Sequence, residues 1–134
     1  MHEYKRMVRM ADTDASGGIY FANVQMIALE AFEDFLHKSG YCLDSIITEG
    51  DFVFPIVHTE ADYLSAMRVG DELNVQMKVT HIGNSSFAIK YNIFSLRTDL
   101  IVAAVGITHV VMCKETKVSI PIPQELFRLL EKEM

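Results

Sequence analysis

The sequence predicts an α+β fold in which one antiparallel sheet packs against a single long amphipathic helix. Apolar residues recur at helical spacing within residues 23–40, and apolar and polar residues alternate with a period of two within residues 73–95. A long apolar segment follows at residues 101–113. The chain has 134 residues and is 50% hydrophobic, so we expect one domain, residues 1–134, with a substantial core.

The first two expected elements are a strand at residues 2–10 and the long helix, separated by a turn rich in Asp and Gly. Asn23 is the expected N-cap of the helix, and Gly40 is the expected stop, because glycine readily takes the left-handed conformation that ends a helix. The expected core positions of the helix are Val24, Ile27, Ala28, Ala31, Phe32, Phe35 and Leu36.

Four strands and a short helix are expected to follow. Residues 52–64 form the first strand despite Pro55, which indicates an edge strand or a bulge. The sequence HIGNSS joins the next two strands as a hairpin, and residues 101–113 form a central strand. A short helix begins near Pro123. The expected core positions of the hairpin are Leu73, Val75, Met77, Val79, Phe87, Ile89, Tyr91 and Ile93. Several strands are apolar on more than one side, so we expect a second subunit to cover part of the sheet.

Composition and spacing exclude several classes of protein. The net charge of −6 argues against a nucleic-acid partner, and the longest apolar segment is shorter than the roughly 20 residues that span a bilayer. The first ten residues lack the apolar region of a signal peptide, so we expect a cytoplasmic location. Cys42 and Cys113 are expected to be free thiols. The histidines lack ligand spacing, so we expect no metal site.

The segment ADTDASGGIYFAN, residues 11–23, raises the question of chemistry. It opens like a calcium loop, but the twelfth position, which needs a bidentate Glu, is Asn23. It also has the composition of a plain strand-to-helix turn. Its place before a long helix favours a third interpretation, because unpaired N–H groups at a helix start can polarise a carbonyl that a nearby carboxylate also reaches.

The segment MADTDASGGIYFAN and the helix VQMIALEAFEDFL resemble the signature of the 4-hydroxybenzoyl-CoA thioesterase family, which has the hot-dog fold. The sequences GDFVFPIVH and GDEL, at residues 50–58 and 70–73, are most similar to the 1,4-dihydroxy-2-naphthoyl-CoA thioesterases of that family. The resemblance covers almost the whole chain. It implies an antiparallel sheet wrapped around one long central helix, in homodimers formed edge to edge that often pair into homotetramers.

The resemblance also implies an acyl-CoA thioesterase for an aromatic or medium-sized acyl group. Asp14 matches the family's catalytic carboxylate, as nucleophile or general base, and the backbone N–H of Phe21 matches the group that polarises the thioester carbonyl. No cofactor is implied, because coenzyme A is part of the substrate. The other residues expected to contact substrate are Gly17, Gly18, Tyr20, His58, Ser85 and Ser86.

Two departures from the family keep alternatives open. Phe21 offers no polar side chain where many relatives carry His or Tyr, and GNSSF at residues 83–87 lacks basic residues for the coenzyme A phosphates. These departures motivate a second hypothesis, a non-catalytic module that binds acyl thioesters. Asp12 is expected to tie the turn together, and Glu30 on the helix is the alternative catalytic carboxylate. His58 either bonds a phenolic hydroxyl of the acyl group or is an ordinary strand histidine.

Overall fold

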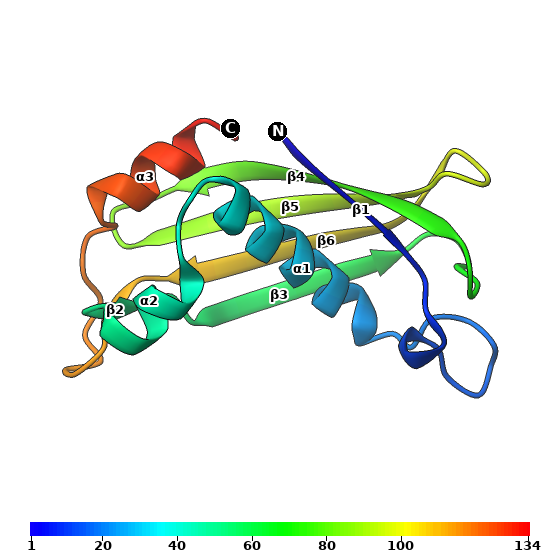
Figure 1. Cartoon of the computed structure of the whole chain (residues 1–134), viewed down its shortest axis with the longest axis horizontal. Helices are drawn as coiled ribbons and strands as arrows, with labels where there is room; N and C mark the ends of the chain where they lie inside the picture. Colours follow the sequence, from blue (N-terminus) through cyan, green and yellow to red (C-terminus); the bar gives the residue numbers. More distant parts are fainter.

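The computed structural model describes residues 1–134, and its main element is a five-stranded antiparallel sheet with the strand order β1-β4-β5-β6-β3. The sheet strands are β1 (His2–Met7), β3 (Ile56–Tyr63), β4 (Glu72–Ile82), β5 (Ser86–Ser95) and β6 (Leu100–Val110). Helix α1 (Asn23–Lys38) lies across one face of this sheet, as Figure 1 shows. The remaining elements are a 3-10 turn (Met10–Asp12), α2 (Leu43–Glu49), β2 (Phe52–Val53), β7 (Met112–Cys113) and α3 (Gln124–Glu131). The predicted layer arrangement is therefore confirmed.

Helix α1 buries all seven of its expected core positions. It ends as predicted, since Gly40 has a φ of +77° and the N–H of Tyr41 donates to the Leu36 carbonyl at 2.9 Å. The N-cap prediction was wrong. The helix begins at Asn23 itself, with Ala22 at the N-cap, and the Asn23 side chain donates to the Ala11 carbonyl instead.

The hairpin of β4 and β5 is confirmed, and all eight of its expected core positions are buried. The first strand ends at Met7 rather than at residue 10. Residues 10–12 instead form a 3-10 turn, in which the Asp12 carboxylate accepts from the N–H of Arg9 at 2.8 Å. Pro55 separates β2 from β3, and β3 is indeed an edge strand with a bulge between Ile56 and His58.

The predicted order of helices and strands differs from the structure in two places. Helix α2 was not expected, because seven residues are too few to establish a helical period. The single strand expected at residues 101–113 is divided into β6 and the short β7, and β6 lies inside the sheet between β5 and β3. Strand β5 is the middle strand. None of the three helices is long and apolar enough to span a bilayer.

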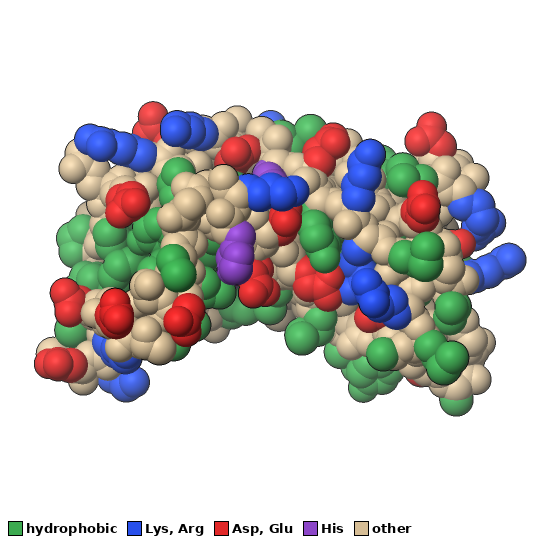
Figure 2. All heavy atoms as spheres, viewed as in Figure 1, with side chains coloured by type: hydrophobic (Ala, Val, Ile, Leu, Met, Phe, Trp, Pro, Cys, Tyr) green, Lys and Arg blue, Asp and Glu red, His purple; other side chains and the backbone are tan.

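Strand β3 is the last strand of the sheet, so the side of it that does not pair with β6 has no partner strand. Every residue in β3 except Ala61 is exposed. Figure 2 shows hydrophobic side chains gathered near the end where α2 and β2 lie, and again beside the loop between β1 and α1. The exposed large hydrophobic residues along β3 and this loop are Met10, Tyr20, Phe21, Ile56, Val57, Tyr63 and Leu64.

Candidate functional site

The loop before α1 is a tight turn held by its own backbone. The N–H of Asp14 donates to the Gly18 carbonyl at 3.0 Å, and the N–H of Tyr20 donates to the Asp12 carbonyl at 2.7 Å. Gly17 has a φ of +86°, a conformation that a residue with a Cβ adopts only with strain. Gly18 forms a bridge with Arg68, which attaches the loop to the segment before β4. The structure therefore holds Asp14 close to the start of α1.

The Asp14 carboxylate is exposed and is oriented by Ser16. Its Oδ1 accepts from the Ser16 hydroxyl and, at 2.8 Å, from the Ser16 N–H, whereas Oδ2 has no partner in the chain. These two hydrogen bonds lower the pKa of Asp14 below its ordinary value, because they stabilise the charged form. The bond from the Ser16 hydroxyl has the larger effect. Asp14 is therefore ionised at neutral pH, with one oxygen held by Ser16 and the other without a partner in the chain.

Replacement of Ser16 by Ala is expected to raise the pKa of Asp14 towards its ordinary value. A carboxyl group with a lowered pKa stays ionised to lower pH, so loss of the hydroxyl moves the acidic limb of kcat/KM to higher pH. The rate well above that limb should change little. A pH profile of thioester hydrolysis for both proteins measures the shift, and superimposed acidic limbs would show that Asp14 is not the titrating group.

The backbone N–H of Phe21 has no hydrogen-bond acceptor within the chain, and neither has the N–H of Ala22. Both precede the first turn of α1, where unpaired N–H groups carry partial positive charge. The Phe21 side chain is 61% exposed and lies against Tyr20, with ring centroids 4.8 Å apart. This main-chain segment thus presents donors that could stabilise an oxyanion beside an ionised carboxylate.

Tyr63, the last residue of β3, anchors this segment. Its hydroxyl donates to the Phe21 carbonyl at 2.6 Å, so an edge strand distant in sequence fixes the peptide that follows Phe21. The sequence did not reveal this contact, because 42 residues separate its two partners. Tyr63 thus contacts the segment that carries the Phe21 N–H and is a candidate positioning residue.

Replacement of Tyr63 by Phe is expected to lower kcat about threefold to tenfold with little change in KM. The change keeps the ring and removes one hydrogen bond, so it loosens the donor segment without altering the surface that binds substrate. Steady-state kinetics separate kcat from KM. An unchanged kcat, or a loss confined to KM, would contradict a positioning role.

Two other acidic residues belong to a structural network. The Asp12 carboxylate pairs with the Arg6 guanidinium, as expected of a residue that ties the turn. Glu30 also binds Arg6, at 2.7 Å, and accepts from the Tyr4 hydroxyl at 2.9 Å. Glu30, the alternative catalytic carboxylate, is thus held against β1 by Arg6, which also binds Asp12.

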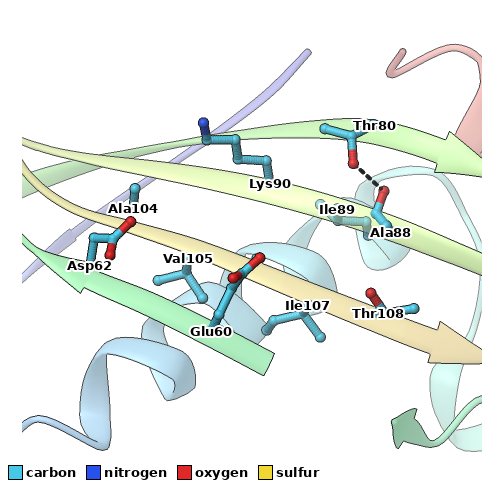
Figure 3. Close-up of a pocket in the computed structure, with 11 residues that line it drawn as sticks. Glu60, Asp62, Thr80, Ala88, Ile89, Lys90, Ala104, Val105, Ile107 and Thr108 are labelled. Atoms are coloured by element: carbon cyan, nitrogen blue, oxygen red, sulfur yellow. Dashed lines mark hydrogen bonds between the residues drawn. The ribbon is translucent and has the colours of Figure 1, made fainter. Parts of the chain in front are cut away.

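The structure does not bring His58 to the loop. His58 pairs with Thr108, so its side chain lies on the outer sheet face, away from α1. Figure 3 shows that face, where a shallow depression of about 270 Å³ is lined by Glu60, Asp62, Lys90 and Thr108 among others. This surface carries charges of both signs and lies on the side of the sheet away from α1.

Ser85 and Ser86 also lie apart from Asp14. Ser85 lies in the turn between β4 and β5, and Ser86 is the first residue of β5. Both are at the end of the sheet opposite the loop, roughly 30 Å away along β4. Within one chain the structure brings together five of the predicted site residues and leaves the other three elsewhere. Those at the loop are Asp14, Gly17, Gly18, Tyr20 and Phe21.

The sequence interpretation also missed a pocket at the far end of α1. It has a volume of about 350 Å³ and lies between α1, α2 and the beginning of β3, with His109 in its wall. The alternation of Val105, Ile107 and His109 in β6 was the available signal, since it places the histidine on the buried face.

The sheet order, the long helix and the loop at the helix start define a hot-dog fold domain. Comparison with known proteins extends this assignment. Residues 8–130 match the family described as the thioesterase-like superfamily, and the chain belongs to that superfamily.

The names of individual relatives include a substrate. The chain is 32% identical over 130 residues to a protein from Acaryochloris marina named 1,4-dihydroxy-2-naphthoyl-CoA hydrolase, covering 96% of this chain and 95% of the relative. A protein of the same name from Nostoc punctiforme is 37% identical over 128 residues, covering 96% and 85%. The crystal structure of a 1,4-dihydroxy-2-naphthoyl-CoA thioesterase from Synechocystis superimposes with a TM-score of 0.92 at 29% identity, covering 96% and 94%.

Proposed function

We propose that this chain is an acyl-CoA thioesterase that hydrolyses the thioester of an aromatic acyl group, with 1,4-dihydroxy-2-naphthoyl-CoA as its substrate. The observation that carries the proposal is the ionised, exposed Asp14 carboxylate held in the same turn as the unpaired N–H of Phe21. The names of its relatives support this substrate. The 4-hydroxybenzoyl-CoA thioesterases remain the wider family that the loop resembles.

The reaction follows from these groups. The thioester carbonyl oxygen accepts from the Phe21 N–H, and the positive end of α1 stabilises the negative charge that develops on it. Asp14 either attacks the carbonyl carbon or removes a proton from the water that attacks it. Coenzyme A then leaves as a thiolate, and in the first case water hydrolyses the acyl–Asp14 anhydride that remains. A thiolate needs little help from an acid, so the apolar side chain of Phe21 is compatible with turnover.

We further propose a homodimer formed through β3. The loop lies exposed in a single chain, and β3 beside it leaves its edge unpaired, a feature that native proteins usually cover. Two-fold pairing of antiparallel β3 strands would place the Tyr63 end of one copy beside the Ile56 end of the other. Each loop would thereby lie near the far-end pocket of its partner.

The outer sheet face offers a second contact surface. Its depression carries Glu60 and Asp62 on β3 and Lys90 on β5, as Figure 3 shows. Opposite charges on one patch can pair with themselves across a two-fold axis, and we propose that dimers associate there into a homotetramer.

Replacement of Thr59 by Pro is expected to convert the dimer into a monomer. The N–H of Leu64 donates to Val102 on β6, so N–H groups an odd number of residues away, including that of Thr59, point to the free edge. Proline there removes a donor from the dimer contact and spares the bonds to β6. Light scattering after size exclusion measures the mass, with Thr59→Val, which keeps the N–H, as the control. An unchanged mass in Thr59→Pro would exclude β3 as the interface.

A thiol-release assay tests the function. The panel comprises benzoyl-CoA, 4-hydroxybenzoyl-CoA, 1,4-dihydroxy-2-naphthoyl-CoA and straight-chain thioesters, and the naphthoyl thioester is expected to give the highest kcat/KM. Calorimetry on the same thioesters distinguishes the second candidate function, the binding module suggested by the apolar Phe21. Binding without hydrolysis of any thioester would favour that module.

A further inference from the structure

The far-end pocket has walls suited to a flat apolar ring. Three leucines from α1 and α2 and two phenylalanines line most of it, and an exposed glutamate stands among them. The lining residues are Leu29, Phe32, Glu33, Leu36, Leu43, Phe54, Pro55, Ile56 and His109. Aromatic and aliphatic walls of this kind bind ring systems through apolar burial and through edge and face contacts between rings.

His109 supplies one polar atom to this apolar surrounding. Its side chain is almost completely buried, at 3% exposure, and its ring stacks on Phe87 with centroids 4.9 Å apart. Its Nδ1 lies 2.9 Å from the Phe54 carbonyl, which can only accept, so Nδ1 carries the proton. Burial lowers the pKa of His109, which keeps the ring neutral at pH 7. Nε2 is then a bare acceptor.

No group in the chain donates to this acceptor. A buried polar atom without a partner costs free energy, and each such atom in a native structure needs an explanation. Nε2 is closed to solvent in the free chain, so a donor reaches it only when a side chain of the pocket wall shifts. A hydroxyl group on a bound aromatic ring would suit this site. The ring would contact the apolar walls, and its one O–H would donate to the one unpaired acceptor, Nε2.

We propose that this pocket binds a hydroxylated aromatic ring and that His109 selects the hydroxyl by accepting its hydrogen bond at Nε2. The inference deepens the proposed function and rests on it for the identity of the ligand, which is the acyl group of the thioester. His109 is then a specificity-determining residue. In the proposed dimer, the aromatic ring of the acyl group lies in the far-end pocket of one copy. The thioester carbonyl lies at the loop before α1 of the other copy.

The test compares ring ligands that differ by one hydroxyl. Wild-type protein is expected to hydrolyse 4-hydroxy-2-naphthoyl-CoA with a kcat/KM about fivefold to tenfold above that for 2-naphthoyl-CoA, the effect of one neutral hydrogen bond. His109→Phe keeps a ring of similar shape and should abolish this preference while still hydrolysing 2-naphthoyl-CoA. His58→Phe, on the outer face, should retain the preference. Retention of the preference in His109→Phe would overturn the proposal, as would its loss in His58→Phe.

A binding measurement separates this proposal from the proposed function. Titration with 1-naphthol and with naphthalene needs no hydrolysis, and the wild type is expected to bind 1-naphthol about fivefold to tenfold more tightly. Leu43→Trp, which fills the pocket from α2, should weaken both ligands and serves if His109→Phe does not fold. Equal affinity of the wild type for both ligands, or unaltered binding in Leu43→Trp, would refute the site. Preference for 1-naphthol in a protein that hydrolyses no thioester would support the site and reject the thioesterase.

Discussion

Replacement of Asp14 by Asn is expected to lower kcat/KM for the naphthoyl thioester by about 10³-fold or more, with no change in fold. The amide has nearly the same shape as the carboxylate and can still accept from Ser16, but it can neither remove a proton from water nor attack a carbonyl. Asp14 is exposed and makes no contact with the core, so the melting temperature should stay close to that of the wild type. The loss would therefore be chemical.

Thiol release under saturating and limiting substrate measures this loss, and circular dichroism checks the fold. Turnover in oxygen-18 water adds the distinction between the two roles of Asp14. Label in the peptide that contains Asp14 after a single turnover would indicate a covalent acyl intermediate that water opens at the Asp14 carboxyl carbon. Label confined to the acid product would show that water attacks the acyl carbon, as general-base catalysis requires. Wild-type activity in Asp14→Asn across the whole panel would reject the mechanism.

Replacement of Phe21 by Pro is expected to lower kcat by about 10²- to 10³-fold, the usual effect of removing one oxyanion donor. Proline has no backbone N–H, so the substitution removes the proposed oxyanion donor. No hydrogen bond within the chain is lost, because the Phe21 N–H has no acceptor there. Phe21→Ala is the matched control. It keeps the N–H and removes the exposed ring, so its kcat should stay within about threefold of the wild type.

Kinetics on all three proteins decide between the donor and the side chain. A large loss in Phe21→Pro alone would identify the main-chain group as the active one. Equal losses in both variants would instead indicate that the Phe21 ring matters and that the N–H does not stabilise the oxyanion.

The sequence predicted well those features that depend on neighbours along the chain. The buried stripe of α1, the alternation in the hairpin and the Asp14 loop are each encoded within one continuous segment, where a period or a turn composition is visible. Tyr63 and the far-end pocket were missed because their partners come together only in the folded chain.

His58 shows how one extra residue in a strand changes the sheet face on which the following side chains lie. Ile56 pairs with His109 on the face that packs against α1, and a regular strand would place His58 on that same face. The bulge between them adds one residue, and this single step moves His58 to the opposite face. Pro55 predicted an irregularity near this point, but nothing in the sequence specified its position or its effect on the following side chains.

The position of the loop and the far-end pocket at opposite ends of α1 has an evolutionary consequence. The proposed catalytic groups lie in a tight turn before α1, while part of the pocket wall comes from α2, a seven-residue surface helix. Mutations in α2 can reshape the wall without disturbing Asp14 or the Phe21 peptide. Descendants of such a chain could therefore acquire new acyl preferences by small, separate steps while the hydrolytic machinery is inherited intact.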